Sequence, residues 1–386
     1  MAARSFNIAI TTPDALARPL AAARAEVSSP AGGIVFVSGA LTQELPRVAE
    51  QVRASWRNVP VCVVPAGGVL TERGEVEGAS AVAGILWSGG RATPIAVGEA
   101  ASSDALREAL AGVAGGRATT VVLFPRSDFA PDLIEGVGSG PQIPRVCVFG
   151  AGTVGGSALA LTGSGEAQRG RAVGLALHGL APPLIEFTAA CRLMTPLARI
   201  DEASGGMVLT VDGTPALDLL SSCMPEIRGA AQGGPTHPQP VVFVALADAE
   251  PGAGPDGADR YVVRPVRGID PGRRGVMVGP EVKPGMRLAF AVRDAAAGRS
   301  GLEAAARSAS RQAMGSAPRF ALYLSCAGRG QGLYGIPDVE SRILRQRFGD
   351  LPIAGMLSAF ELVPWGPGET RLALYTGVLA LFRSPS

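Results

Sequence analysis

The segment Ser325-Cys-Ala-Gly-Arg-Gly330 combines residue types that could bind a small anion. It follows an apolar run, Arg319–Ser325, that is typical of a buried strand, and its two glycines let successive backbone N–H groups converge on one oxygen. Arg329 adds a planar guanidinium, which matches the two oxygens of a carboxylate. The alternative is an ordinary turn with Arg329 in solvent. Under the first interpretation, the residues that contact a ligand are Ser325, Cys326, Gly328, Arg329 and Gly330.

Glu361 is a carboxylate in an otherwise apolar stretch, Leu357–Pro364. Because an unpaired buried charge is costly, we expect Glu361 either at an exposed loop tip or beside a cation such as Arg329 or Arg371. In a unit with two parallel strands, the loops after both strands emerge at one edge of the sheet, where open α/β sheets bind ligands. Arg329 and Glu361 are then expected to face one cavity and to bind an amino acid. A structural salt bridge between them is the alternative.

The ligand interpretation makes a mutational prediction. Replacing Arg329 by alanine should abolish ligand binding and barely change the stability of the free protein, because a surface bridge contributes only about 0 to 1 kcal/mol. A large loss of stability would instead indicate a structural role for the pair.

Cys326 is the one candidate nucleophile in a plausible setting, because a nearby cation lowers the pKa of a thiol. Neither of the two histidines, His178 and His237, has a sequence position that identifies it as the base for Cys326. We therefore predict no catalytic residue and expect a binding protein, with an enzyme that uses Cys326 as the alternative. A small buried cysteine is the common structural fate of this residue type.

Cofactor signals are weak. One axial histidine suffices for haem, so His178 or His237 could be a ligand, but lone histidines are usually structural and we predict no cofactor. No two histidines share helical spacing, so no metal site is predicted. Gly150-Ala-Gly-Thr-Val-Gly155 fits the dinucleotide pattern, but the stretch after it is rich in Gly and Ser and does not read as the helix that a Rossmann site needs.

Length and charge narrow the possible classes of protein. A chain of 386 residues is too long for one core, so we expect two domains, 1–195 and 196–386. Lys+Arg 35 against Asp+Glu 33 gives a net charge of +2, too balanced for nucleic acid or an anionic membrane. No apolar run is long enough to span a membrane and the N-terminus lacks a signal peptide, so a cytoplasmic location is expected.

The predicted elements form a unit that occurs three times: a strand, an amphipathic helix, a Pro-led strand, a loop of small residues and a third strand. The copies cover Gly33–Trp87, Thr119–Leu177 and Arg319–Thr376, and the last strand of the third copy is predicted at Arg371–Thr376. The fold class is therefore α/β, with sheets flanked by helices and with three repeated strand-helix-strand-loop-strand units across two domains. Between the second and third copies the predicted elements are strands at Met207–Val211, Val241–Leu246, Tyr261–Val266 and Met286–Val292 and a helix at Ala295–Met314.

The C-terminal third contains four motifs in a fixed order: Tyr261-Val-Val-Arg-Pro-Val-Arg-Gly-Ile-Asp270, Phe290-Ala-Val-Arg-Asp294, Leu324-Ser-Cys-Ala-Gly-Arg-Gly330 and Pro352-Ile-Ala-Gly355. Together these motifs resemble the FIST C-terminal domain. The N-terminal half is similar to the FIST N-terminal domain, and Pro65-Ala-Gly-Gly-Val69 stands where that family has a turn of small residues. The chain is identified as a stand-alone bacterial-type member.

The resemblance implies a sensory role in signal transduction, with a small molecule such as an amino acid as ligand and a separate protein as signalling partner. It adds Gly67, Gly68 and Gly355 to the expected ligand contacts. A haem-based gas sensor is the alternative within the family. Phe360 stands where the family has a glycine before the glutamate, so we expect a changed pocket shape.

Overall fold

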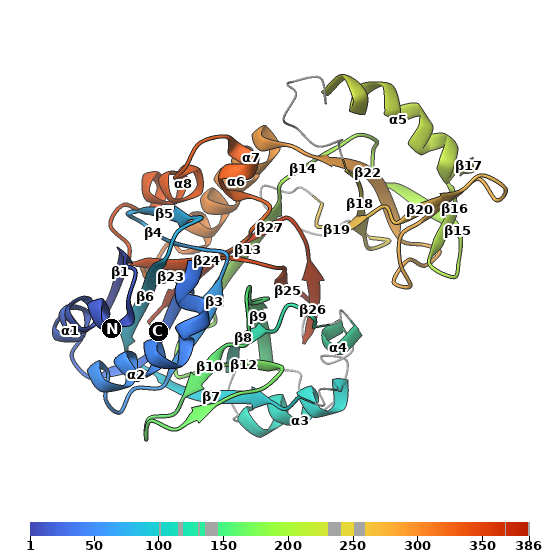
Figure 1. Cartoon of the computed structure of the whole chain (residues 1–386). Helices are drawn as coiled ribbons and strands as arrows, with labels where there is room; N and C mark the ends of the chain where they lie inside the picture. The colour runs from blue at the N-terminus through green and yellow to red at the C-terminus, as the bar shows by residue number, and fades with distance from the viewer. Residues whose placement is uncertain are drawn as a thin grey trace. The chain divides into compact units, whose positions relative to one another are not determined.

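The computed structural model describes residues 1–99, 102–114, 119–129, 132–135, 146–230, 241–250, 259–366 and 368–384, which form two compact units (Figure 1). The first unit contains residues 1–188, 302–372 and 376–386, and the second contains residues 189–301 and 373–375. One boundary near residue 195 therefore does not describe the compact units. The reason is that the third repeat, although late in the sequence, shares its sheet with strands of the first repeat.

The first repeat forms the predicted elements in the predicted order. Two parallel strands, β2 and β3, are joined through a helix, and β6 runs antiparallel to β2 on its other side. The helix buries Leu45, Val48 and Val52 on one face, as their spacing predicts. Its elements are β2 (Pro30–Ser38), η2 (Gly39–Glu44), α2 (Leu45–Ser55), β3 (Val61–Ala66) and β6 (Ala81–Ser88).

The second repeat has the same topology, with a parallel pair β8 and β9 and an antiparallel strand β12 beside β8. Its predicted residues Pro144 and Val137 lie outside the described part of the chain. The described elements are β8 (Thr119–Pro125), α4 (Asp132–Glu135), β9 (Val146–Ala151) and β12 (Ala172–His178).

The third repeat also has this topology, with the parallel pair β23 and β24 and an antiparallel strand beside β23. The prediction of that last strand at Arg371–Thr376 was wrong. The strand that pairs with β23 is the next apolar run, and Arg371 belongs to a strand of another sheet. The elements of the repeat are β23 (Pro318–Cys326), α7 (Gly330–Tyr334), α8 (Val339–Phe348), β24 (Ile353–Ser358) and β27 (Thr376–Arg383).

Each repeat donates a hairpin to the sheet of another repeat. The hairpin after β3 pairs with β24, the hairpin after β24 pairs with β9, and the hairpin after β9 pairs with β3. The three donations form a closed cycle. The donated hairpins are β4 (Gly68–Thr71) with β5 (Gly74–Glu77), β10 (Leu159–Leu161) with β11 (Ala167–Gln168), and β25 (Glu361–Gly366) with β26 (Glu369–Ala373).

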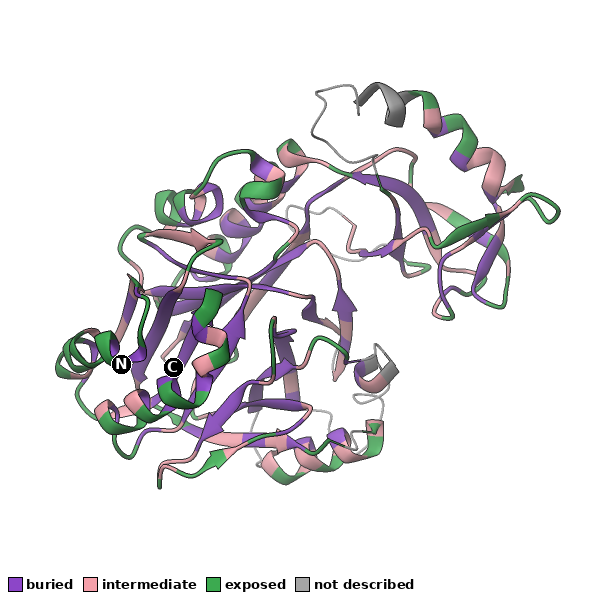
Figure 2. Cartoon of the chain, viewed as in Figure 1, coloured by how far each residue is buried: buried purple, intermediate pink, exposed green. Residues whose placement is uncertain are grey.

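One further strand completes each sheet at its opposite edge. The resulting strand orders are β1-β6-β2-β3-β10-β11, β7-β12-β8-β9-β25-β26 and β13-β27-β23-β24-β4-β5, so three six-stranded sheets share one topology. The strands are buried along most of their length, and the neighbouring helices expose one side (Figure 2). The completing strands are β1 (Ala3–Ala9), β7 (Arg91–Val97) and β13 (Leu184–Ala189).

A column of aromatic rings joins the three sheets. Trp87 of the first sheet stacks on Phe320 of the third at a centroid distance of 5.2 Å, and Phe320 stacks on Phe382 at 4.5 Å. Phe382 lies 6.3 Å from Phe149 of the second sheet. All four rings are at most 1% exposed, so the three sheets share one apolar centre.

Helices cover the outer faces of the sheets. Trp56, which follows α2, donates from its indole nitrogen to Leu20 O at 2.9 Å and so ties α2 to α1. No helix in the described part of the chain is long and apolar enough to cross a membrane. The remaining helices of the first unit are η1 (Pro13–Leu16), α1 (Ala17–Glu26) and α3 (Ser103–Val113), and α6 (Ala295–Gln312) begins in the second unit and ends in the first.

The second unit contains the strands that were predicted between the second and third repeats. β22 is its central strand and pairs with β14, β15 and β18. The helix α5 was not predicted, because its segment carries Pro225, a residue that disfavours the interior of a helix. The elements are β14 (Cys191–Leu193), β15 (Ala198–Ser204), β16 (Met207–Val211), β17 (Thr214–Pro215), α5 (Ala216–Ala230), β18 (Val242–Ala247), β19 (Val262–Pro265), β20 (Gly268–Asp270), β21 (Gly275–Met277) and β22 (Arg287–Arg293).

The aromatic column predicts the effect of removing its central ring. Phe320→Ala should lower the free energy of unfolding by about 3 to 5 kcal/mol, because it leaves a cavity between two stacked neighbours. Urea denaturation measures the change. Ile336→Ala is the matched control, since Ile336 is 49% exposed and its truncation should change stability by only about 0.5 kcal/mol. Equal effects of the two substitutions would contradict a shared centre.

Candidate functional site

The carboxyl ends of the three parallel strand pairs meet, because the loops that follow β3, β9 and β24 hydrogen-bond to one another. Gly67 N–H donates to Leu357 O at 2.8 Å and Val154 N–H donates to Pro65 O at 3.1 Å. Gly152 N–H donates to Phe360 O at 2.8 Å. Each bond joins two different repeats, so the edges at which α/β sheets bind ligands coincide.

The loops at this meeting point reach the surface with small residues. Ala327 and Gly155 are exposed, and Gly67 and Gly328 are half-buried. A side chain at position 67 would start 3.6 Å from the Ala327 methyl carbon and 3.8 Å from a methyl carbon of Val154, so loops of three repeats crowd around this glycine. We call residues 67, 152–156, 327–330 and 359 the convergent loops.

Arg329 is fully buried under these loops and binds groups of its own chain. Its Nε donates to Glu340 Oε1 at 2.7 Å and its Nη1 donates to Thr188 O at 3.0 Å. Its Nη2 lies 3.3 Å from Tyr334 Oη, which also donates to Glu340 Oε1. Although burial opposes the charge, the Glu340 carboxylate holds the pKa of Arg329 well above its usual value. One alternative placed Arg329 in solvent, but it is buried. The other paired it with Glu361, but its ion pair is with Glu340.

Glu361 is also fully buried, and two hydroxyls connect it to the arginine pair. Ser358 Oγ lies 2.6 Å from Glu361 Oε1 and 2.9 Å from Ser325 O, while Ser325 Oγ donates to Glu340 Oε2 at 2.6 Å. A hydroxyl carries one proton, so when Ser358 donates to Ser325 O, a protonated Glu361 completes the other bond. Burial raises the pKa of Glu361 well above its usual value, which favours that protonated form.

The network of Arg329 and Glu361 binds the backbone at two of the four places where the chain crosses between the units, which are 188/189, 301/302, 372/373 and 375/376. Arg329 binds the carbonyl of Thr188, and the chain passes to the second unit at Ala189. Glu361 Oε2 accepts from Thr376 N–H at 3.3 Å, and Thr376 is the first residue after the return through Tyr375. Two buried ionisable groups beneath the convergent loops therefore bind the backbone at two of these four crossings.

The other predicted contacts have structural explanations. Gly355 lies within β24, where an added side chain would meet Tyr323 O at 1.9 Å, and Gly68 packs against the Leu357 side chain. Cys326 is 6% exposed at the end of β23. The ring of Phe360 packs on Gly152, where an added side chain would begin 2.5 Å from the ring. The glycine at 152 therefore leaves room for the bulky residue at 360, where a glycine was expected.

Two carboxylates of hairpin β4–β5, Glu75 and Glu77, bind the helices of the third repeat and were not predicted from the sequence. Glu77 also explains why residue 330 is a glycine. A side chain at 330 would start 2.4 Å from the Glu77 carboxylate, whose Oε1 accepts Gln331 N–H at the start of α7. Glu75 Oε1 accepts Ser341 N–H at 2.7 Å at the start of α8. Burial first, and then the charges of Glu340 and its acidic neighbours, raise the pKa of Glu75 to about 7.

His178, the histidine that the structure describes, is not part of the convergent loops. His178 Nδ1 lies 3.5 Å from Thr119 Oγ1 at the end of β12, and burial together with Arg91 lowers its pKa. His237 lies outside the described residues. The glycine pattern at 150–155 is followed by strand β10 rather than by a helix, which departs from the Rossmann arrangement. Across the described ranges, no three His, Cys, Asp or Glu residues are grouped so as to hold a metal ion.

Two family models match the chain, and they divide it into consecutive segments. The FIST N domain matches residues 32–214 and the FIST C domain matches residues 216–364. The chain belongs to the FIST family. FIST domains are regarded as sensory domains of signal transduction.

Relatives of this FIST protein occur in mycobacteria. An uncharacterized protein of Mycobacterium tuberculosis strain H37Rv is 32% identical over 126 residues, which are 33% of this chain and 32% of the relative. An uncharacterized protein of Mycobacterium bovis is 26% identical over 215 residues, 54% of this chain and 53% of the relative. The chain thus matches about a third of the length of the first relative and about half of the second.

The residues that sequence reasoning missed are the partners of the predicted charges. Glu340 and Tyr334 are the side chains that bind Arg329, and Ser358 is the hydroxyl beside Glu361. A carboxylate near the start of a predicted helix, as Glu340 is, is usually attributed to the helix dipole. The contact with Thr188 is made by a backbone carbonyl, which leaves no signal in the sequence.

The burial of Arg329 reverses the prediction made for its alanine variant. Arg329→Ala should lower the free energy of unfolding by about 3 to 5 kcal/mol, because it leaves Glu340 buried without its cation. Glu340→Leu should have a similar cost. The double variant Arg329→Ala with Glu340→Leu should cost less than the sum, because it removes both charges together. Urea denaturation of the four proteins gives the coupling, and additive losses would contradict the pairing.

The raised pKa of Glu75 predicts how stability depends on pH. The folded protein keeps the Glu75 proton up to about pH 7, whereas the unfolded chain loses it near 4.5. This contribution to stability is therefore complete below pH 4.5 and is lost as the pH rises to 7. Glu75→Gln, which stays neutral and still accepts from Ser341, should be more stable than the parent at pH 8 and equal to it at pH 4. Thermal melts across this range test the difference, and parallel curves would contradict it.

Proposed function

We propose that this protein is a sensor that binds a small molecule at the convergent loops and transmits the change through Arg329 and Glu361. The observation that carries the proposal is that these two residues bind the backbone of Thr188 and Thr376, which lie at two of the four crossings between the units. A ligand that moves the loop containing Arg329 alters the hydrogen bond that holds one crossing. Such a ligand shifts the protein between two states only if it binds one state more tightly.

The network supports binding rather than catalysis. Arg329 and Glu340 are held by each other, and both have at most 1% of their side chains exposed. A direct contact between a ligand and Arg329 therefore requires the loop to open, whereas contact with Ala327 does not. We propose an amino acid or a related small metabolite as the ligand, with a separate protein as signalling partner. Enzymatic use of Cys326 remains the alternative.

The test is a thermal-shift screen of amino acids and related metabolites. A true ligand at a hundredfold excess over its Kd should stabilise the protein by about 2.7 kcal/mol. Ala327→Trp should abolish this shift, because the indole covers the convergent loops, and should leave the melting temperature of the free protein within a degree or two. Ala22→Trp on the exposed face of α1 is the matched control and should keep the shift.

Amide hydrogen exchange separates binding from transmission. Ligand should change exchange at residues 189–193 and 373–375 in the parent protein. In Glu361→Ala the change at 373–375 should be lost, even where this variant still binds. A flat screen contradicts the sensor proposal. A shift that survives in Ala327→Trp places the ligand away from the convergent loops, and unchanged exchange at both segments contradicts the transmission route.

A further inference from the structure

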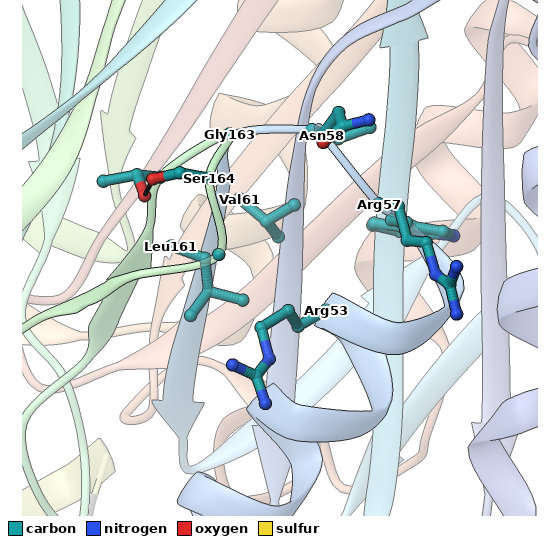
Figure 3. A pocket seen from close by; sticks show the side chains of 11 residues that line it. Arg53, Arg57, Asn58, Val61, Leu161, Gly163 and Ser164 are labelled. Carbon is teal, nitrogen blue, oxygen red and sulfur yellow. Dashed lines mark hydrogen bonds between the residues drawn. The ribbon is translucent and has the colours of Figure 1, made fainter.

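Helix α2 and hairpin β10–β11 border a second candidate site, which involves none of the convergent loops. Two cavities of about 150 and 330 Å³ adjoin here and share Arg53, Leu161 and Gly165 in their lining. In the smaller cavity, Arg53 comes from α2 and Arg57 and Asn58 from the segment after it, while Gly163 and Ser164 come from the hairpin loop (Figure 3). We call the two cavities together the arginine cleft.

The arginines of this cleft have no acidic partner in the structure. Arg53 and Arg57 line the smaller cavity and Arg169 lines the larger one. Within the described ranges, none of these three side chains makes an ion pair or a hydrogen bond. Some other arginines of the first unit, such as Arg47 and Arg126, are paired with a carboxylate, whereas others are not. The three arginines of the lining outnumber its two carboxylates, Glu50 and Glu166, so the cleft has a net positive charge.

The local backbone explains why two cations are tolerated at this place. Arg53 lies in the last turn of α2 and Arg57 follows the C-cap Trp56, and the helix dipole favours positive charge at this end. Both arginines line the smaller cavity, where their like charges repel each other. A bound anion removes that repulsion, and two guanidinium groups offer it paired N–H donors.

At the corresponding place in the third repeat, the donated hairpin binds the helix directly. There hairpin β4–β5 lies against α8, and Glu75 accepts the Ser341 N–H. The register of the hairpins places Arg169, just beyond β11, at the position that corresponds to Glu75. The first repeat thus has an arginine and a cavity where the third has a carboxylate bound to the helix.

We propose that the arginine cleft binds a small organic anion with a phosphate or carboxylate head. The head binds Arg53 and Arg57 in the smaller cavity, with Asn58 available as a further donor. The Thr162 and Ser164 hydroxyls bind each other at 2.8 Å, so one of the two can also donate to the ligand. The larger cavity receives the body of the molecule. A volume of about 330 Å³ is at the lower end of that of small-molecule sites.

The lining of the larger cavity restricts the body. Pro46, Ala49 and Leu159 are apolar, whereas Glu50 and Glu166 are acidic. The two carboxylates disfavour a second anionic group there and accept hydrogen bonds from hydroxyl or amine donors. The ligand is therefore an anion at one end only, and its other end is apolar or carries donors.

Titration calorimetry with two probes, phenyl phosphate and inorganic phosphate, tests the site at low ionic strength. We expect phenyl phosphate to bind with a Kd of about 1 mM or tighter and more tightly than inorganic phosphate, because its ring enters the larger cavity. Arg53→Ala with Arg57→Ala should weaken both probes by about tenfold or more. Added salt should weaken them as well, since the cleft is open to solvent.

Arg18→Ala is the matched control, because Arg18 is an exposed helical arginine of α1 that likewise makes no ion pair with the described residues. It should leave both affinities unchanged. The proposal is overturned if neither probe binds at ~10 mM, if the double variant binds as the parent does, or if Arg18→Ala weakens binding equally. Equal affinities for the two probes would remove the larger cavity from the site. None of these outcomes depends on a ligand at the convergent loops.

Discussion

The open edge of the second strand in each repeat is the constraint on which the rest of this structure depends. β3, β9 and β24 each pair on one side with a parallel strand of their own repeat, and their other edges carry backbone groups that need partners. No repeat covers that edge itself. Each edge is covered by a hairpin that begins directly after the second strand of another repeat, so the three loops that start the hairpins must lie together. The convergent loops are a geometric result of this exchange.

The Arg329–Glu340 ion pair is buried beneath the convergent loops and connects them to another part of the chain. Taking two charges out of water is costly, and apolar residues of the same volume often stabilise a protein as well or better. Here the charges bind backbone groups as well as each other, and one of those groups is the Thr188 carbonyl at the exit from the first unit. Glu361 does the same for Thr376, where the chain returns to this unit for the second time. The network thus makes the position of one loop depend on two distant points of the chain.

Part of this arrangement follows from the sequence. Apolar runs and helical spacing predicted the main elements of the three repeats, four strands of the second unit (β16, β18, β19 and β22) and the helix α6, because burial imposes its pattern locally. The hairpin exchange could not be predicted, since β10 and β11 are short and their partner β3 lies about a hundred residues away. The last strand of the third repeat was misplaced for a related reason, because two neighbouring apolar segments compete for one position and only the sheet decides between them.

In the candidate sites, too, some residues could be predicted from their neighbours in the sequence, whereas their partners could not, because only the fold brings them together. Arg329 and Glu361 drew attention because charged residues in small-residue or apolar stretches demand an explanation. Glu340, which binds Arg329, looks like an ordinary residue of a helical first turn. Arg53 and Arg57 look like the solvated face of a helix, and only the hairpin donated by the second repeat gives them a cleft.

The cycle of hairpins has a consequence for the origin of the fold. A single repeat made as a separate chain would have both an unpaired edge and an unplaced hairpin, and three copies would satisfy both by swapping hairpins around a threefold ring. The first unit is therefore equivalent to a domain-swapped homotrimer whose protomers have been fused into one polypeptide. Fusion replaces association between chains by a high effective concentration. It also lets the copies differ, and here the third copy contains a buried ion pair whereas the first has arginines that line a cavity.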